Sequence, residues 1–359
     1  MHIVLAGGGT AGHIEPALNT ADALRARDCG YSFSVLGTSK GLETTLVPAR
    51  GYELTLIPAV PLPRKINADL FTLPFRLRTA IAEVKQHLIQ RKANVVVGFG
   101  GYVSIPAYLA ARSLGIPIVV HEANAKPGIA NRIGAKFADA VVDTVAGSIK
   151  GATTLGLPLR FAIRNIDKPA CRAAAIEVWN LDVHKKTILV FGGSLGARRL
   201  NEVVAKSASQ LTEAGYQILH SVGSANHDHL NNSIPGYTTV PYIDRMDFAY
   251  AVADLAVSRA GAMTVAELTA VGLPAIYVPL PIGNGEQRLN AEPVARAGGG
   301  IVIEDSNFNP DILVSTVKQW LSSDMTTRSE AAALCGHKDA VESFIDIIIA
   351  TARNPEVTR

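Results

Sequence analysis

Three glycine-rich turns interrupt the chain where an apolar, strand-like run passes into a helical pattern. They read GGGTAGH over residues 7–13, GFGGY over 98–102 and FGGSLGA over 191–197. Glycine lets the backbone approach an anion closely, and the helix that follows directs N–H groups and the positive end of its dipole toward it. The turns therefore predict strand–turn–helix units that bind phosphorylated ligands.

Strand and helix patterns alternate along the whole chain. Helical patterns begin near Ile14, Leu42, Ile105 and Gly128. Strand-like runs lie near residues 2–6, 32–36, 94–97, 117–120 and 140–142, and then near 187–191, 217–220, 238–240, 254–257, 275–278 and 301–303. Continuous apolar strands are typical of parallel sheets covered on both faces. The pattern predicts an α/β fold of two Rossmann-like domains with parallel sheets facing an interdomain cleft, where a ligand would bind at the carboxyl ends of the strands.

Length and composition are consistent with two domains. A chain of 359 residues exceeds what one hydrophobic core usually serves. We expect an N-terminal domain over 1–160, a C-terminal domain over 161–338, and a last helix over about 339–359 that packs back onto the first domain. The three cysteines have no metal-type spacing and indicate a reducing compartment, and the first residues lack the pattern of a signal peptide.

The first turn also fits a dinucleotide site. Gly7, Gly9 and Gly12 match the G-x-G-x-x-G pattern, but residues 35–40 offer no acidic side chain for an NAD ribose. Lys40 leaves NADP open as an alternative. His13 stands directly after the glycines, where a histidine acts as a base or a hydrogen-bond donor near neutral pH, or merely caps the helix.

The ordered motifs resemble the MurG family of bacterial glycosyltransferases, which add N-acetylglucosamine from UDP-GlcNAc to the lipid-linked muramyl-pentapeptide of peptidoglycan synthesis. The resemblance covers nearly the full length. It is carried by the three glycine-rich turns and by HEANAKPGIANR (121–132), GLPLR (156–160), YIDRM (242–246), SRAGAMTVAEL (258–268) and PLPIGNGEQRLNA (279–291). It implies the GT-B architecture, in which two Rossmann-like domains face a cleft, and agrees with the two series of strands and helices.

The resemblance implies a donor site mainly on the C-terminal domain. Ile243 would present backbone groups to the uracil, Glu267 would accept hydrogen bonds from the ribose hydroxyls, and Arg160 would reach the nucleotide. Gln287 and Asn124 would bind sugar hydroxyls. The full implied donor set is Thr10, Ala11, Gly12, Asn124, Arg160, Ser194, Ile243, Ala262, Met263, Thr264, Val265, Ala266, Glu267 and Gln287.

For the acceptor, the resemblance implies a diphosphate site on the first two turns, at Gly9, Thr10, Gly12, Gly100, Gly101 and Tyr102. His13 is then the candidate general base for the attacking hydroxyl, and a single displacement would invert the anomeric carbon. The chain has no Asp-x-Asp to hold a metal between carboxylates and diphosphate. We therefore expect no metal and no cofactor.

Three positions depart from the family pattern. Ala11 replaces a usual glycine, Leu157 stands where asparagine is frequent in G-N-P-V-R, and Leu195 takes the place of glutamine in G-G-S-Q-G-A. Ala11 is small enough for the turn if its φ is negative. The two leucines each remove a polar partner, so no contact is carried over to them.

Basic charge gathers in residues 61–92, which hold seven basic and two acidic residues in a chain of net charge +3. Apolar side chains lie among them, a mixture that suits an anionic bilayer surface. Alone, such a run is more often a solvated helix face. Given a lipid-linked acceptor, we expect peripheral binding to the cytoplasmic face of the cell membrane, through Arg64, Lys65, Phe71, Phe75, Arg76 and Arg78.

The leading interpretation is thus transfer of N-acetylglucosamine to lipid I, giving lipid II. Other cell-wall synthesis or division proteins are candidate partners, and nucleic acid is not expected because no recognition motif accompanies the basic charge. The alternatives are another GT-B sugar-nucleotide enzyme, either an epimerase or a transferase with a soluble acceptor, an NADP-dependent oxidoreductase, and a sugar-nucleotide binder without activity.

Overall fold

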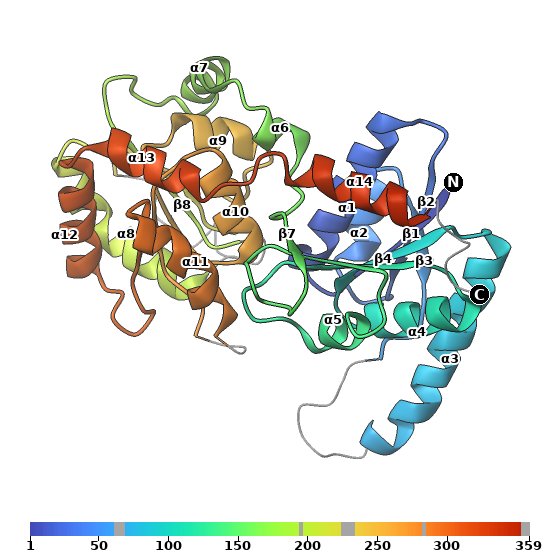
Figure 1. Ribbon diagram of the computed structural model, residues 1–359. Coiled ribbons are helices and arrows are strands. Elements are labelled where there is room, and N and C mark those ends of the chain that lie inside the picture. Colours follow the sequence, from blue (N-terminus) through green and yellow to red (C-terminus); the bar gives the residue numbers. More distant parts are fainter. Residues whose placement is uncertain (61–68, 194–196, 224–233, 282–284, 353–359) are drawn as a thin grey trace. The chain divides into compact units, whose positions relative to one another are not determined.

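The structure is a computed structural model that describes residues 1–60, 69–193, 197–223, 234–281 and 285–352, with residues 69–71 described by their backbone alone. It divides into two compact units (Figure 1). Unit 1 comprises Met1–Leu159 and Asp339–Arg359, and unit 2 comprises Arg160–Lys338. Each unit is built on a parallel sheet, so the expected α/β class is confirmed.

Within the described residues, unit 1 holds a seven-stranded sheet in the order β3-β2-β1-β4-β5-β6-β7. The strands are β1 (His2–Gly7), β2 (Ser32–Gly37), β3 (Glu53–Leu56), β4 (Val95–Gly100), β5 (Ile118–Glu122), β6 (Ala140–Asp143) and β7 (Thr153–Thr154). The helices are α1 (Ala11–Arg27), α2 (Glu43–Ala49), α3 (Asp69–Gln90), α4 (Ser104–Leu114), α5 (Ile129–Gly134) and α14 (Ala340–Ala352). Every pair of neighbouring strands is parallel.

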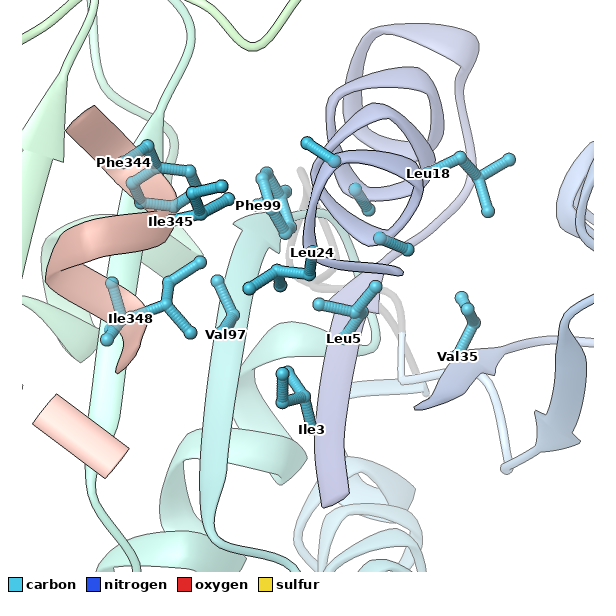
Figure 2. Packing of buried hydrophobic residues seen from close by; sticks show 14 of the residues in the cluster. Ile3, Leu5, Leu18, Leu24, Val35, Val97, Phe99, Phe344, Ile345 and Ile348 are labelled. Atoms are coloured by element: carbon cyan, nitrogen blue, oxygen red, sulfur yellow. The ribbon is translucent and has the colours of Figure 1, made fainter. Parts of the chain in front are cut away.

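Both faces of this sheet are buried, which explains the unbroken apolar strands. Alternate residues of a strand point to opposite faces. Ile3 and Leu5 of β1 join the core formed with α1 and α14, whereas Val4 and Ala6 join the core formed with α3 and α4. Figure 2 shows the first of these cores.

The last helix, α14, completes the core of unit 1. Phe344, Ile345 and Ile348 are fully buried in the same cluster as the side chains of β1, β4 and α1 (Figure 2). The Phe344 ring lies with its centroid 6.0 Å from that of Phe99 and 4.9 Å from that of His121. The end of the chain therefore supplies part of the hydrophobic interior of the unit that the beginning of the chain forms.

Unit 2 holds a six-stranded parallel sheet among its described residues, in the order β10-β9-β8-β11-β12-β13. The strands are β8 (Thr187–Phe191), β9 (Gln217–Ser221), β10 (Tyr237–Val240), β11 (Leu255–Ser258), β12 (Ala275–Tyr277) and β13 (Gly300–Val302). The helices are α6 (Phe161–Arg164), α7 (Lys168–Trp179), α8 (Arg198–Glu213), α9 (Met246–Val252), α10 (Ala262–Ala270), α11 (Glu286–Ala297), α12 (Pro310–Leu321) and α13 (Met325–Leu334). Ile188 and Val190 of β8 pack in one core with side chains of α8 and α12.

Strands β3 and β7 are the two that sequence analysis missed. They lie at the edges of the unit 1 sheet, and their residues are half-buried or exposed. Such short edge strands carry no continuous apolar run, because only one neighbour and little core cover them. The sequence signal for a buried parallel strand is therefore weak there.

Candidate active site

In unit 1 the strand order reverses between β1 and β4. Ligands of open α/β sheets bind outside the carboxyl ends of the strands at such a switch point. GGGTAGH follows β1, GFGGY spans the end of β4, and Gly7 pairs with Gly100 in the sheet. The structure thus brings the two turns implied for the acceptor diphosphate side by side.

Where the second turn meets the first, at Gly100 and Gly101, there is no room for a side chain. A Cβ on Gly101 would lie 2.3 Å from the carbonyl oxygen of Gly8, and Gly101 has a φ of +85°. A Cβ on Gly100 would lie 3.1 Å from His13 Nε2. These glycines therefore allow the second turn to pack directly against the first, while the Tyr102 side chain remains 48% exposed beside them.

His13 lies in the first turn of α1 and is half-buried. Its Nδ1 is 3.2 Å from the carbonyl oxygen of Gly8 and 3.3 Å from Thr10 Oγ1. A carbonyl only accepts, so the hydrogen bond to Gly8 assigns the proton to Nδ1 and leaves the lone pair on Nε2. Burial lowers the pKa of His13, against the raising effects of the Gly8 hydrogen bond and the charge of Glu122, and so favours a neutral ring that can accept a proton.

The rest of the first turn forms the start of α1. Thr10 is the N-cap, and its hydroxyl is exposed. Ala11 and Gly12 are the first two helical residues, so Ala11 has the negative φ that the turn needs from a residue with a Cβ. The amide of Gly9 donates to Glu43 Oε2 at 3.0 Å, so it is already engaged by the protein.

A buried carboxylate that sequence analysis overlooked organises the loop after β5. Glu122 is 2% exposed and accepts hydrogen bonds from the amides of Asn124 (2.9 Å) and Gly128 (3.1 Å) and from Asn131 Nδ2 (2.9 Å). Asn124, implied for the donor sugar, is half-buried in this loop of unit 1. The sequence signal that could have identified Glu122 is its position at the end of a strand, because the carboxyl ends of parallel strands lie at the same edge of a sheet.

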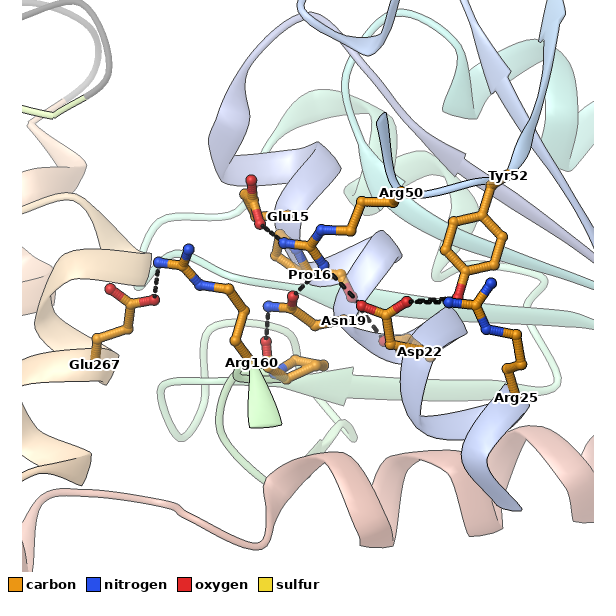
Figure 3. Close-up of polar contacts among 11 residues, drawn as sticks. Glu15, Pro16, Asn19, Asp22, Arg25, Arg50, Tyr52, Arg160 and Glu267 are labelled. Carbon is orange, nitrogen blue, oxygen red and sulfur yellow. Dashed lines mark hydrogen bonds and ion pairs between the residues drawn. The ribbon is translucent and has the colours of Figure 1, made fainter. Parts of the chain in front are cut away.

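A second polar network ties the segment before Arg160 to α1 (Figure 3). Asn19 is buried and donates from Nδ2 to the Pro158 carbonyl at 2.9 Å. Arg50 donates to Asn19 Oδ1 at 3.0 Å and forms an ion pair with Glu15 at 2.7 Å. Nearby in the sequence, Leu157 is 2% exposed, so this departure from the family pattern serves as an apolar core residue.

The sheet of unit 2 has its own switch point, between β8 and β11. The glycines of the third turn follow β8, and Ser194 and Leu195 of that turn lie outside the described residues. Residues 259–261 follow β11 and lead into α10. Gly261 is the N-cap of α10 and makes no side-chain capping bond, so the amides of Ala262, Met263 and Thr264 precede the first intrahelical hydrogen bond, from Val265 to Gly261. This helix end has the geometry of an anion site.

One helical turn into α10, the Glu267 carboxylate is buried with both oxygens engaged. Oε1 accepts from Arg160 Nη2 at 3.1 Å (Figure 3). Oε2 accepts from the Tyr250 hydroxyl at 2.7 Å. Glu267 is 5% exposed, and Tyr250 is 2% exposed. Arg160 and Glu267, both implied for the donor, are thus in direct contact, while Tyr250 is a member of the cluster that sequence analysis missed.

Gln287 bridges two strand-end segments of unit 2. Its Oε1 accepts from the amides of Ala260 at 3.2 Å and Leu280 at 3.0 Å, which directs the Nε2 amide away from these bonds. Ile243 lies between β10 and α9 and is 3% exposed as a whole residue, so its implied backbone contact with the uracil stays a prediction. Val265 and Ala266 are half-buried along α10.

The basic segment near α3 has two different halves. Ala80, Val84 and Leu88 are buried, and Val84 and Leu88 join the core that Val4 and Ala6 of β1 enter, as in an ordinary amphipathic helix. Nearer the start of α3, Phe75 is 76% exposed and Arg78 is exposed, whereas Arg76 is half-buried and donates to the Ala59 carbonyl. Arg64 and Lys65 lie outside the described residues, as does the side chain of Phe71.

The described part of the chain contains no cluster of histidine, cysteine and acidic side chains arranged to hold a metal ion. None of its helices is long and apolar enough to cross a bilayer.

Comparison with known proteins covers both units. Residues 3–143 match the N-terminal domain of glycosyltransferase family 28, and residues 187–344 match its C-terminal domain. A Streptomyces avermitilis protein named UDP-N-acetylglucosamine–N-acetylmuramyl-(pentapeptide) pyrophosphoryl-undecaprenol N-acetylglucosamine transferase is 54% identical over 354 residues, which cover 97% of this chain and 98% of that protein. A Mycobacterium protein of the same name (strain KMS) is 51% identical over 357 residues, covering 98% and 96% of the two chains.

Solved structures are consistent with this assignment. The crystal structure of Acinetobacter baumannii MurG matches with a TM-score of 0.78 and 28% identity, covering 97% of this chain and 99% of that one. The calicheamicin glycosyltransferase CalG4 matches with a TM-score of 0.72 and 15% identity over 98% of each chain, which bears on the fold alone. This chain therefore belongs to the MurG family of glycosyltransferases, as its full-length relatives and the two matching domains show.

Proposed function

We propose that this chain transfers N-acetylglucosamine from UDP-GlcNAc to the pyrophosphoryl-undecaprenol-linked muramyl-pentapeptide, lipid I, and so forms lipid II for peptidoglycan. The observation that carries the proposal is the 54% identity, over 97% of the chain, to a transferase named for this reaction. The epimerase, soluble-acceptor and NADP alternatives lack a relative of that kind among those described above.

In this proposal the donor binds unit 2. The free amides at the start of α10 meet the UDP diphosphate, and the Gln287 amide donates to a sugar hydroxyl. Glu267 accepts from the ribose hydroxyls. Because Arg160 and Tyr250 already occupy both Glu267 oxygens, ribose binding displaces Arg160, whose guanidinium then turns to the diphosphate. A cation and a helix N-terminus at the leaving UDP stabilise the charge that develops there.

The acceptor binds unit 1 at the paired glycine turns, with Thr10, Gly12 and Tyr102 near its diphosphate. The acceptor hydroxyl oxygen forms a bond to the anomeric carbon while the bond from that carbon to the UDP oxygen breaks, which inverts the configuration. His13 Nε2 takes the hydroxyl proton. The Nδ1 hydrogen bond to Gly8 supports this role because it leaves the lone pair on Nε2.

A membrane-linked acceptor accounts for the exposure of Phe75 and Arg78 on α3. We assign peripheral binding on the cytoplasmic face of the membrane to this part of α3, where Phe75 is exposed beside basic side chains. An apolar side chain enters the bilayer boundary, and each basic residue near anionic lipid contributes on the order of 1 kcal/mol.

The test is UDP release from UDP-GlcNAc with a short-chain lipid I analogue, followed by mass analysis of the product. We expect UDP release only with acceptor, and a product heavier by one N-acetylhexosamine. Isomerisation of the donor without acceptor would favour an epimerase, and NADP binding without UDP binding would favour an oxidoreductase.

His13→Ala should retain UDP binding and lose turnover, and near-normal turnover at saturating substrates would remove the base assignment.

A further inference from the structure

Beneath the first glycine turn lies a carboxylate that the proposed reaction leaves unused. Glu43, the first residue of α2, is 0% exposed. Its Oε1 accepts from the amide of Thr38 at 2.8 Å and from Thr38 Oγ1 at 3.0 Å, and its Oε2 accepts from the amide of Gly9 at 3.0 Å. A Cβ on Gly41 would lie 1.8 Å from Oε2, so the chain leaves space for this carboxylate.

Gly9 links this carboxylate to the candidate base. The Gly9 N–H and the Gly8 C=O belong to one planar trans peptide, so they point in opposite directions. The N–H donates to Glu43, and the C=O accepts from His13 Nδ1 at 3.2 Å. One peptide plane therefore has a carboxylate at its donor end and an imidazole at its acceptor end.

We propose that Glu43 is a positioning residue that acts on His13 through the Gly8–Gly9 peptide. Glu43 fixes the rotation of this peptide and so directs the Gly8 carbonyl at Nδ1. It also polarises the peptide, which makes the carbonyl a stronger acceptor. His13 is thereby held in the Nδ1–H tautomer, with Nε2 facing Gly100 and ready to take a proton. In a Ser-His-Asp triad a carboxylate orients the histidine directly, whereas here a peptide lies between the carboxylate and the histidine.

The charge of Glu43 is maintained inside the protein. Burial alone would raise the pKa of Glu43, but the hydrogen bonds from Thr38 and Gly9 outweigh it and lower the pKa. The carboxylate whose charge raises the pKa of His13 is Glu122, at the end of β5. Glu15, farther along α1, is paired with Arg50. Glu43 thus provides a permanent negative charge that reaches His13 through a defined hydrogen-bonded path.

The inference depends on the proposed role of His13 as base, but its first test needs no activity. Nitrogen-15 spectra of the full-length chain labelled at histidine, recorded without substrates at pH 8, report the tautomer of each ring. The His13 signals are assigned by their loss in His13→Gln. We expect protonated Nδ1 and unprotonated Nε2, and the opposite tautomer would overturn the proposal.

The second test compares Glu43→Gln with Thr38→Val. Glutamine keeps the size but provides one acceptor oxygen in place of two, so the Gly9 amide and Thr38 compete for it. We expect kcat to fall by about 10–100-fold, the size of loss that follows removal of the outer hydrogen-bond partner of a metal-binding histidine. The acid limb of the kcat/KM profile should move to lower pH because a negative charge is lost, while affinity for UDP stays unchanged.

Thr38→Val removes a hydrogen bond to the same carboxylate but leaves the bond to Gly9, so it should cost less than about fivefold in kcat. An unchanged kcat and acid limb in Glu43→Gln, or an equal loss in Thr38→Val, would overturn the proposal. If Glu43→Gln fails to fold, the tautomer measurement decides. Failure of wild-type transfer would reject the proposed function and leave the tautomer result intact.

Discussion

Replacing Phe344 with alanine tests whether the end of the chain holds unit 1 together. Phe344 lies on α14, is 0% exposed and packs on the rings of Phe99 and His121. The cavity would open on the face of the sheet that α1 and α14 cover (Figure 2). Ser343→Ala is the matched control, since Ser343 is the preceding residue of the same helix and is exposed.

The expected cost follows from burial. A buried Phe→Ala change costs about 3–5 kcal/mol, because the transfer energy of the ring is lost and the neighbours collapse only partly. Domains are stable by only about 5–15 kcal/mol, so unit 1 would lose a large part of its stability. For a domain of this size the melting temperature should fall by roughly 10 °C. The control should change the free energy of unfolding by less than about 0.5 kcal/mol.

The chain offers a probe for each unit. Its two tryptophans, Trp179 and Trp320, both belong to unit 2, so their fluorescence follows unit 2 while hydrogen exchange of β4 and β5 peptides follows unit 1. We expect faster exchange in β4 and β5 of Phe344→Ala and a smaller change in the tryptophan transition. A loss below about 1 kcal/mol in unit 1 would refute the assignment of α14 to its core.

Three further predictions follow from other sites. Burial lowers the pKa of His121 to about 4 and that of His220 to about 3. Unfolding returns the pKa of each histidine to about 6.5, so the unfolded chain binds more protons than the folded chain as the pH falls below 7. Together the two histidines should lower the free energy of unfolding by roughly 4 kcal/mol at pH 5 relative to pH 8. Urea unfolding across this pH range should show the decline, and a flat profile would contradict it. Phe75→Ser should weaken binding to phosphatidylglycerol vesicles in a sedimentation assay. Ile89→Ser, which replaces an exposed residue near the other end of α3, should not weaken it. Equal effects of the two substitutions would show that Phe75 does not contact the membrane. Tyr250→Phe should weaken UDP binding by several-fold in calorimetry, because the buried Glu267 carboxylate loses a hydrogen bond of about 1 kcal/mol. An unchanged affinity for UDP would count against the role of Glu267 in binding the ribose.

The overall class and most strands could be predicted because their signals are local. An apolar run such as Val95-Val96-Val97 is buried on both faces, and a glycine turn after it marks the start of a helix. The edge strands β3 and β7 were missed because partial exposure removes that signal. The sequence predicted only that Arg160 and Glu267 bind the same nucleotide. Their direct contact could not be predicted, because no periodicity indicates a contact over such a separation in sequence.

The sequence by itself determined where phosphate-type turns occur, because glycine spacing and apolar runs act within a few residues. The tertiary structure decided which turns meet. Gly101 touches Gly8 only because β4 lies beside β1, and Glu43 reaches Gly9 only because the segment after β2, the other neighbour of β1, folds α2 under the first turn. A carboxylate at position 43 is, in sequence, an ordinary residue of a first helical turn. Its hydrogen bond with Gly9 arises from strand order, which no local pattern encodes, whereas its bonds with Thr38 form within the loop after β2.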